Sequence, residues 1–344
     1  MAFFSKQLPS DAPNGVSCQV HRLANALVEQ GETVMCYSFS PKPTDALYNH
    51  SQLCSSKKRP RFALKILPAI RFRMIKTGKY DILHFHGDDY LCAGSARRVR
   101  TFYGSALYEA RFAEKPSRFM YQALFYFFEL VSCARRGKKI AISRVTTRAL
   151  PCVKQTVPCG VPLTRYSPGA KKTPCPSLLF IGDLDSRKRG RLLVDVFTNR
   201  ILPSYPRASL TIVGPQKCIA PGIVCTGKLS EEALIEEYRK AWMYCSASSY
   251  EGFGVPLIEA MACGTAVVAL RSAGAREIIT HGFDGLLCAD EELPETLRQL
   301  ITDAALRTGL AGNGLQTAKK YDIRAVARRY REIYETCGQQ SIST

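Results

Sequence analysis

Short runs of apolar and β-branched residues alternate along the chain with segments whose apolar residues recur at helical spacing. Near the N-terminus, a run at residues 2–5 precedes Val20, Leu23, Ala24 and Leu27, which share one helical face, and Gly31 supplies a stop signal. Further runs that predict strands lie at residues 33–39, 81–85, 139–142, 178–181, 210–213, 243–246 and 266–269. This alternation predicts parallel sheets covered by helices.

The clearest linker in the chain is the stretch at residues 162–176, which holds four prolines, one glycine and two lysines. Strand–helix units precede it and follow it in similar number. We therefore expect an α/β protein with two doubly wound, Rossmann-like domains that face each other across a cleft. The expected domains are residues 1–165 and residues 166–322, and such sheets bind ligands beyond the carboxyl ends of their strands.

The charge is distributed unevenly between the two halves of the chain. The 344 residues carry 48 Lys and Arg against 29 Asp and Glu, a formal net charge of +19. Residues 1–165 hold 26 basic and 10 acidic side chains, whereas residues 166–344 hold 22 and 19. The basic first half favours an acidic partner, which could be nucleic acid, anionic lipid or a phosphorylated substrate.

The cysteines and the apolar segments bear on the compartment. The 14 cysteines include no C-x-x-C pair, and the chain opens without a long apolar signal region. We therefore expect free thiols and a cytoplasmic location. The most apolar stretch, residues 119–134, is shorter than the ~20 residues that span a bilayer and contains Gln122 and Glu129. It predicts a buried helix.

The most informative stretch for chemistry is SSYEGFGVPLIEAMACG at residues 248–264. A glycine turn that opens a helix presents backbone N–H groups and a positive dipole end, which suit a phosphate or a sugar oxygen. Glu251, just before the turn, can accept hydrogen bonds from hydroxyl groups. Glu259, about two helical turns further on, can bind a vicinal diol such as ribose. The alternative is a loop and helix with two solvated glutamates.

This stretch resembles the donor-site motif of the retaining family 4 glycosyltransferases, which have the GT-B fold. Weaker similarities follow the family's order along nearly the whole chain: PNGV at 13–16, DILHFH at 81–86, AISR at 141–144, CGV at 159–161 and the segment 180–190. The resemblance implies a closing helix over about residues 323–344 that packs back on the first domain.

The resemblance also implies roles for individual residues of the donor loop. Glu251 corresponds to the glutamate that holds the donor sugar, and Glu259 to the glutamate that binds the ribose. The loop that approaches the sugar and its phosphates corresponds to Gly252, Phe253 and Gly254.

Further roles follow from the other segments. Lys188 and Arg189 stand where cations neutralise the donor diphosphate, so with Glu251 they are the catalytic candidates. Gly182 belongs to the same phosphate segment, and Gly15 corresponds to the residue whose backbone faces the diphosphate from the first domain. The resemblance implies no metal and no cofactor, only the nucleotide sugar as co-substrate.

The sequence departs from the family pattern at several positions. Asp183 stands where Arg is frequent, Arg189 where Lys is commoner, and Pro162 where the family has Asp. Tyr103 replaces a histidine that would face the reaction centre, so the acceptor side differs more than the donor side.

His84 and His86 are alternate residues of one predicted strand and so share a face. They could line the acceptor side of the cleft, pack through hydrogen bonds, or ligate a metal, although no third ligand has convincing spacing. With Tyr103 they are our acceptor-side candidates. Asp88 and Asp89 could form a metal-binding acidic pair, but the resemblance to a metal-independent family favours a solvated turn.

The segment from Lys57 to Lys79 is strongly basic, with nine Lys or Arg and no acid, and large apolar residues are interleaved. Pro60 and Pro68 argue against one long helix. The segment could lie on an anionic bilayer, or it could be a helix on the sheet with a solvated basic face.

These observations predict a retaining hexosyltransferase that moves a sugar from a UDP- or GDP-sugar to a hydroxyl of a glycan or lipid-linked acceptor, as in polysaccharide synthesis. We expect it in the cytoplasm, peripheral on the inner face of the membrane. The alternatives are a basic nucleic-acid-binding protein, a GT-B epimerase or phosphorylase, and a non-catalytic relative. No nucleic-acid-binding signature supports the first.

Overall fold

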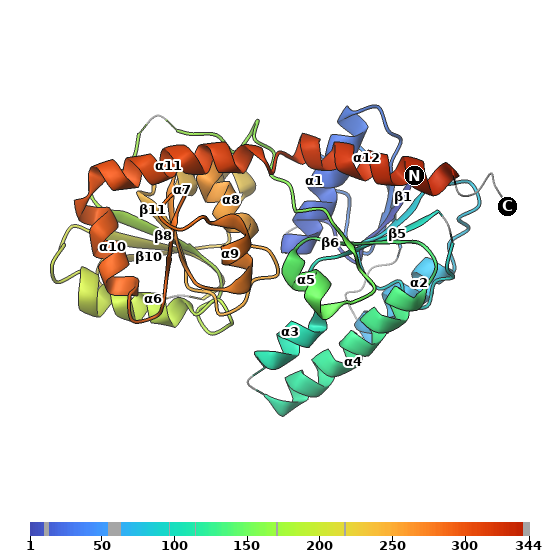
Figure 1. The fold of residues 1–344 in the computed structure, drawn as a ribbon, viewed down its shortest axis with the longest axis horizontal. Helices are drawn as coiled ribbons and strands as arrows, with labels where there is room; N and C mark the ends of the chain where they lie inside the picture. The colour runs from blue at the N-terminus through green and yellow to red at the C-terminus, as the bar shows by residue number, and fades with distance from the viewer. Residues whose placement is uncertain are drawn as a thin grey trace. The chain divides into compact units, whose positions relative to one another are not determined.

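The computed structural model describes residues 1–9, 14–53, 63–95, 97–113, 115–169, 171–216 and 218–339. The chain forms two compact units, which are described here one at a time (Figure 1). Unit 1 contains residues 1–160 and the C-terminal segment from residue 323, and unit 2 contains residues 161–322. Residues 161–165, which we expected at the end of the first domain, therefore belong to unit 2.

Unit 1 is built on a parallel sheet with the strand order β3-β2-β1-β4-β5-β6-β7 among the described residues. β1 pairs with both β2 and β4, so the strand order reverses at this point, where doubly wound folds bind ligands. Its strands are β1 (Ala2–Phe4), β2 (Met35–Ser38), β3 (Asn49–Gln52), β4 (Leu83–Phe85), β5 (Arg98–Phe102), β6 (Lys138–Ala141) and β7 (Gln155–Thr156). Its helices are α1 (Gly15–Glu29), α2 (Ala63–Arg73), α3 (Ala106–Arg111), α4 (Pro116–Ala134), α5 (Arg144–Ala149) and α12 (Ile323–Gln339).

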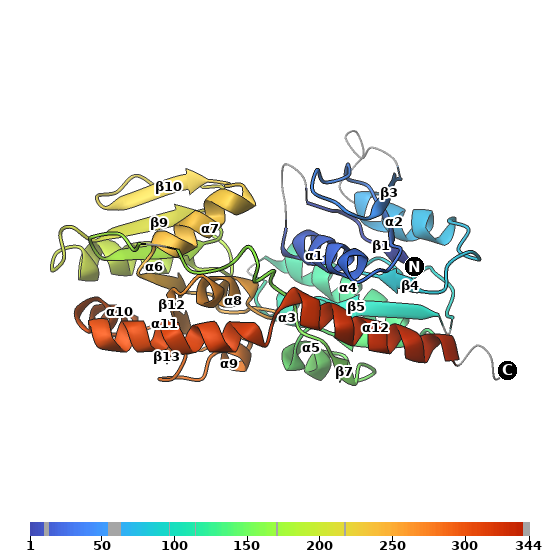
Figure 2. The ribbon, with the colours of Figure 1, turned by 90° about the horizontal axis from the view of Figure 1, so that it is seen from above.

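The closing helix α12 belongs to the core of unit 1 and packs on α1 (Figure 2). Val20 and Leu23 of α1 share a buried apolar cluster with Val326 and Tyr330 of α12 and Val99 of β5. The chain thus returns from unit 2 to complete the unit in which it began.

Unit 2 has a second parallel sheet, with the order β10-β9-β8-β11-β12-β13 among the described residues. Its strands are β8 (Ser177–Ile181), β9 (Ser209–Val213), β10 (Ile223–Gly227), β11 (Met243–Ser246), β12 (Ala266–Leu270) and β13 (Leu286–Cys288). Its helices are α6 (Gly190–Val196), which continues as the π-helical segment η1 (Phe197–Ile201), and α7 (Glu231–Lys240), α8 (Val255–Ala262), α9 (Ala273–Ile278), α10 (Leu293–Thr302) and α11 (Ala304–Lys319). The prediction of two doubly wound α/β sheets is confirmed.

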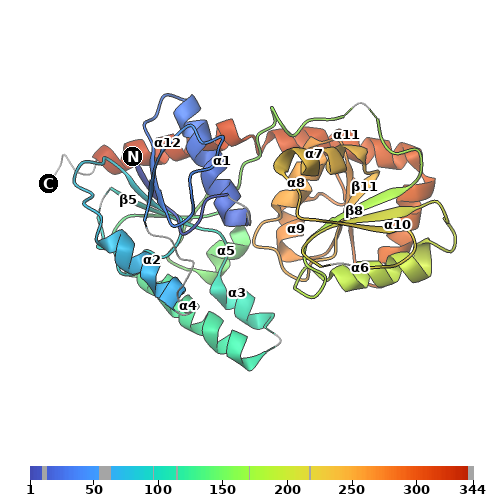
Figure 3. The same cartoon turned by 180° about the vertical axis from the view of Figure 1, so that it is seen from behind.

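Helix α4 contradicts the prediction of a buried helix. It runs over most of the expected stretch, but Met120, Phe127 and Phe119 are 71 %, 58 % and 53 % exposed. Figures 1 and 3 show α3 and α4 extending along the outside of unit 1. No helix among the described residues is long and apolar enough to cross a membrane.

The expectation that all cysteines are free thiols is wrong for one pair. Cys133, in the last turn of α4, forms a disulfide with Cys152, and their Cα atoms lie 5.9 Å apart. The bond ties α4 to the segment that follows α5. The other described cysteines are not in disulfide bonds.

Candidate active site

The predicted donor loop follows β11 in unit 2 and ends where α8 begins. Gly254 is the N-cap residue of α8 and has a φ of +117°, a conformation that side-chain-bearing residues rarely adopt. Gly252 precedes it in the loop, while the Phe253 ring is buried edge-on against Tyr321. Phe253 therefore presents its backbone, and not its side chain, to a ligand.

Glu251 is held between two cations. Its carboxylate forms ion pairs with Lys188 and with Arg187, whose Nη1 lies 3.2 Å from Oε2, and it accepts a 2.7 Å hydrogen bond from Ser248 Oγ. Burial favours the neutral acid, but the charges of Lys188 and Arg187 outweigh it and lower the pKa of Glu251. This carboxylate is therefore ionised and can only accept hydrogen bonds.

The loop between β8 and α6 brings Lys188 to this position. β8 and β11 are neighbouring parallel strands, so the segments that follow them leave the same edge of the sheet. The side chain of Lys188 crosses Gly182, where an added Cβ would lie 2.8 Å from Lys188 Cγ. Gly182 thus makes room for the lysine that pairs with Glu251.

Arg189 does not join this group. Its guanidinium forms a bidentate ion pair with Asp290, with Nη1 3.0 Å from Oδ1. Arg189 has a φ of +54°, which turns the chain just before α6. The sequence interpretation missed Arg187. The only sequence feature that pointed to Arg187 was its place in the basic run of residues 187–189. The family resemblance assigned the diphosphate role to the other two residues of that run, Lys188 and Arg189.

Glu259 lies on the buried side of α8, and its Oε2 accepts a 2.9 Å hydrogen bond from the Tyr238 hydroxyl. It thus has a positioning partner on α7, whose N-cap residue is Ser230. Both predicted donor glutamates are buried in unit 2, one in the loop and one on the helix.

In unit 1, Gly15 is exposed at the start of α1. Asn14 caps this helix through a reciprocal capping box with Ser17. The preceding part of the predicted first glycine loop, including Pro13, lies outside the described residues.

His84 is fully buried, and both of its ring nitrogens are occupied. Nδ1 lies 2.7 Å from the Tyr334 hydroxyl of α12 and Nε2 lies 2.8 Å from Thr101 Oγ1. Burial, reinforced by the charge of Arg100, lowers the pKa of His84 well below its usual range. The contacts favour the packing interpretation for this residue, as a neutral link between β4 and the closing helix.

His86 and Tyr103 line a cavity of about 280 Å³ beyond the carboxyl ends of β4 and β5. The Tyr103 hydroxyl lies 2.9 Å from His86 Nδ1, whereas His86 Nε2 is buried without a hydrogen-bond partner among the described residues. Arg100 and Glu129 also line the cavity. Burial raises the pKa of Glu129 to about 7, against the hydrogen bonds that it accepts from Ala106 and Ser105.

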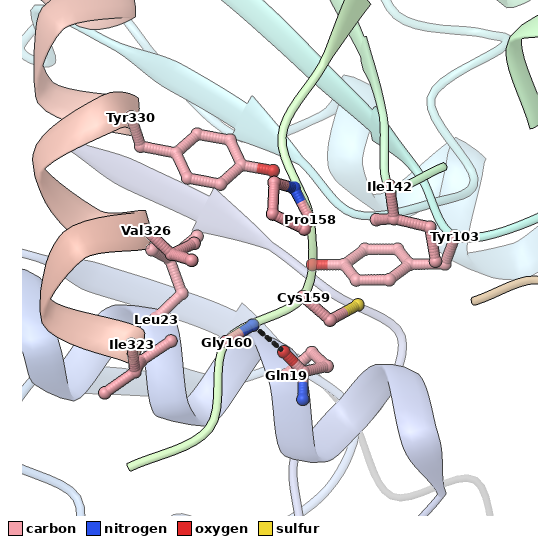
Figure 4. A pocket seen from close by; sticks show the side chains of 10 residues that line it. All are labelled: Gln19, Leu23, Tyr103, Ile142, Pro158, Cys159, Gly160, Ile323, Val326 and Tyr330. Carbon is pink, nitrogen blue, oxygen red and sulfur yellow. Dashed lines mark hydrogen bonds between the residues drawn. The ribbon is translucent and has the colours of Figure 1, made fainter. Parts of the chain in front are cut away.

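Tyr103 also borders a second, much smaller cavity of about 10 Å³, shown in Figure 4. There Gln19 Oε1 accepts a 3.0 Å hydrogen bond from the Gly160 N–H, and Gln19 Nε2 is buried without a partner among the described residues. This space suits a single water molecule and not a substrate.

Asp89 contradicts the prediction of a solvated turn. It is 1 % exposed, pairs with Arg98 and Arg100, and accepts a 2.8 Å hydrogen bond from Ser132 of α4. Its carboxylate is taken up by neutralising two buried guanidinium groups. Among the described residues, no three His, Cys, Asp or Glu side chains gather to hold a metal.

The basic segment from Lys57 to Lys79 is described only from residue 63 onward, so Lys57, Lys58, Arg59 and Arg61 lie outside the described residues. Pro68 lies inside α2 and does not end it, which corrects the sequence interpretation. Phe72 of α2 packs in an apolar cluster with Phe4 of β1 and Phe85 of β4, while Ile70 is 44 % exposed.

Comparisons with known proteins agree with this architecture. Residues 175–303 match the family described as Glycosyl transferases group 1, and residues 13–165 match Glycosyltransferase Family 4. A phosphatidyl-myo-inositol mannosyltransferase of Mycolicibacterium smegmatis is 24 % identical over 95 % of this chain and 91 % of its own length.

Two solved structures share the fold over nearly the whole chain. Sucrose-phosphate synthase from Thermosynechococcus elongatus superposes with a TM-score of 0.78 and 19 % identity over 100 % of this chain and 99 % of that one. Anabaena HepE in complex with UDP and glucose gives a TM-score of 0.74 and 15 % identity over 96 % and 98 %. With family matches on both halves and one two-domain fold, the chain belongs to the family 4 glycosyltransferases of the GT-B fold.

Proposed function

We propose that this glycosyltransferase is a retaining enzyme that uses a UDP- or GDP-sugar and transfers a hexose to a hydroxyl group of a glycan or lipid-linked acceptor. The observation that carries the proposal is the buried Glu251 carboxylate, held by Lys188 and Arg187 beside the glycine turn of α8. The HepE structure in complex with UDP and glucose and the phosphatidyl-myo-inositol mannosyltransferase support the choice of donor and of a lipid-linked acceptor.

In this proposal the donor binds mainly to unit 2. Glu251 accepts hydrogen bonds from hydroxyl groups of the donor sugar, and Glu259 binds the ribose. Lys188 and Arg189, together with backbone N–H groups at the turn of residues 252–254, offset the charge of the diphosphate. Gly182 contributes the space that the Lys188 side chain occupies, since its own N–H donates to the Val213 carbonyl oxygen.

Retention of configuration needs no nucleophile from the protein. The bond between the anomeric carbon and the leaving phosphate oxygen breaks, and the acceptor oxygen bonds to the same face of that carbon. The acceptor proton passes to the leaving phosphate. The protein contributes positioning and electrostatic stabilisation of that phosphate, so its cations matter more than a catalytic base.

The cavity beside His86 and Tyr103 is the acceptor site in this proposal. His86 Nε2, which has no hydrogen-bond partner among the described residues, bonds an acceptor hydroxyl, while the hydrogen bond between His86 Nδ1 and the Tyr103 hydroxyl fixes the ring. His84 supports the cavity wall from behind and does not touch the acceptor, because both its nitrogens are occupied.

A lipid-linked acceptor would place the enzyme in the cytoplasm, on the inner face of the membrane. The basic segment from Lys57 to Lys79 would then attract anionic lipid, because each cation near such a surface gains about 1 kcal/mol. Replacing Lys57, Lys58, Arg59 and Arg61 by Ser should weaken binding to anionic vesicles and leave nucleotide affinity unchanged. Unaltered vesicle binding would remove this part of the proposal.

The donor is identified by calorimetric titration with UDP, GDP and ADP, followed by hydrolysis of the matching nucleotide sugars. Transfer to a hydroxyl acceptor with retention, read from the anomeric configuration by NMR, supports the proposal. Inversion, release of a sugar phosphate on adding inorganic phosphate, or epimerisation of the donor overturns it. Salt-sensitive duplex binding without nucleotide binding would favour the nucleic-acid alternative.

A further inference from the structure

Helix α4 is amphipathic, but its polar face points into unit 1 and its apolar face points outward. Its polar side chains point into unit 1: Glu129 accepts hydrogen bonds from Ser105 Oγ and the Ala106 N–H, and Ser132 bonds Asp89. Gln122 lines the cavity beside His86. The opposite face is apolar and exposed.

The exposed face forms a stripe along the helix. We name it the α4 stripe, and it consists of Phe119, Met120, Leu124, Phe127 and Leu130. These residues are separated by one, three or four positions, so they share one side of an α-helix, and all are at least 38 % exposed. Figures 1 and 3 show the rest of unit 1 on one side of α4 only. Soluble proteins rarely leave so many large apolar side chains together in water, so the stripe is a contact surface.

Cations flank the stripe at both ends. Arg111, Lys115 and Arg118 are exposed around the start of α4, and Arg136 is exposed just after its end. The carboxylates described nearby are engaged: Glu109 pairs with Arg118, and Glu129 points inward. Residues 109–118 carry three cations against the two carboxylates Glu109 and Glu114, so this end keeps a net positive charge, as does the end at Arg136. The surface is thus apolar along its length and positive at both ends.

This charge pattern favours an anionic bilayer over a second copy of the chain as the partner of the stripe. A second copy of the chain that packed stripe against stripe would oppose cation to cation, whether the two helices ran parallel or antiparallel. A bilayer with anionic headgroups accepts the apolar side chains between its acyl chains and the cations among its phosphates. A helix of 19 residues is about 28 Å long, enough to lie along such a surface.

We propose that the α4 stripe inserts into the headgroup region of an anionic bilayer and anchors unit 1 there. The inference rests on the proposed function only in that a lipid-linked acceptor makes attachment useful. It is independent of the segment from Lys57 to Lys79, because the apolar anchor lies on a different element. Binding to lipid can be measured without donor, acceptor or turnover.

The test is cosedimentation of the full chain with vesicles of phosphatidylcholine mixed with phosphatidylglycerol, and with phosphatidylcholine alone. Replacing Met120, Leu124, Phe127 and Leu130 by Ser should weaken binding to the mixed vesicles on the order of a hundredfold. The matched control replaces Ile219 and Phe283, exposed apolar residues of unit 2, by Ser and should leave binding unchanged. Circular dichroism confirms that each variant is folded.

A second measurement detects insertion directly and needs no loss of function. Trp at position 127 (Phe127→Trp) should shift its fluorescence to the blue with mixed vesicles, whereas Phe283→Trp should not. Unchanged binding of the Ser variant, no shift from Phe127→Trp, or equal binding to neutral vesicles overturns the proposal. So does a dimer of the wild-type chain that the Ser variant dissolves, because that outcome assigns the stripe to a second copy. Loss of sugar transfer with intact vesicle binding would instead count against the proposed function alone.

Discussion

Lys188 pairs with Glu251 by passing its side chain over the bare backbone of Gly182. The two charged residues are 63 positions apart in the sequence and come together because β8 and β11 are neighbours in the sheet. Gly182 has a φ of +153°, and an added Cβ would lie 2.8 Å from Lys188 Cγ. The ion pair between Glu251 and Lys188 therefore depends on Gly182, which has no side chain to block the lysine.

Gly182→Ala should displace Lys188 and disorganise the donor site. We expect sugar transfer to fall about a hundredfold, the effect of a misplacement of about 1 Å, with a loss of about 1–2 kcal/mol in the free energy of unfolding. Gly309→Ala is the matched control, since Gly309 is exposed within α11 and its Cβ would meet nothing within 4 Å. Steady-state kinetics and urea unfolding measure both effects. Normal transfer by Gly182→Ala would show that the position of Lys188 is unimportant.

Glu251→Ala and Arg189→Ala should each lower sugar transfer by ~10²–10³ while the protein stays folded, because preorganised electrostatic partners have effects of this size. Glu295→Ala, which removes an exposed glutamate of the same unit, serves as control and should have little effect. Asp290→Ala frees the Arg189 guanidinium without removing it, so its effect should be smaller than that of Arg189→Ala. Near-normal turnover in both Glu251→Ala and Arg189→Ala would refute the assignment of the donor site.

Eight of the described strands and the position of the donor loop could be predicted because they depend on local sequence, whereas β3, β5, β7, β10 and β13 were not expected. β11 spans Met243–Ser246 as expected, since its apolar run is bounded by polar and loop-forming residues. Gly254 was likewise recognisable, because a glycine before an apolar helical segment signals the turn it forms.

Side-chain partners could not be predicted in the same way. The pattern of α4 is apolar on nearly every side, so it could not show that Glu129 and Ser132 would find buried partners and leave Phe127 outside. Arg187 and Arg189 are the same residue type in one basic run, so the sequence does not distinguish their partners. Only the turn at Arg189, with its positive φ, sends one toward Asp290 and leaves the other beside Glu251.

Glu129 should make the stability of unit 1 depend on pH. Burial raises its pKa from an ordinary value of 4.5 to about 7, so the unfolded chain releases this proton at lower pH than the folded protein. The stabilising contribution is fully present below pH 4.5 and is lost as the pH rises through about 7. Glu129→Gln should therefore gain in Tm relative to the wild type between pH 5 and 8, by an amount equivalent to roughly 1–3 kcal/mol. A constant difference in Tm across this range would contradict the assignment.

Tyr334→Phe should destabilise unit 1 by about 1–3 kcal/mol, because it leaves Nδ1 of the buried His84 without its 2.7 Å hydrogen bond. The effect should be confined to stability, since Tyr334 belongs to the closing helix and not to the cavity lining. Tyr205→Phe in unit 2 is the control, because the Tyr205 hydroxyl makes no side-chain hydrogen bond within the described residues. Urea denaturation at pH 7.5 measures both variants. Equal stability would show that His84 needs no link to α12.

Sugar transfer should survive treatment with EDTA. Lys188, Arg187 and Arg189 are all within or beside the proposed diphosphate site, and cationic side chains and backbone N–H groups can offset a diphosphate without a divalent ion. In this structure these cations are paired with Glu251 and Asp290. A bound diphosphate would share the cations with these carboxylates, and hydroxyl groups of the donor sugar would donate new hydrogen bonds to Glu251. Initial rates with and without EDTA, at one nucleotide-sugar concentration, provide the measurement. Complete loss of transfer on chelation, restored by manganese or magnesium, would show that the diphosphate is held through a metal and that these cations have another role.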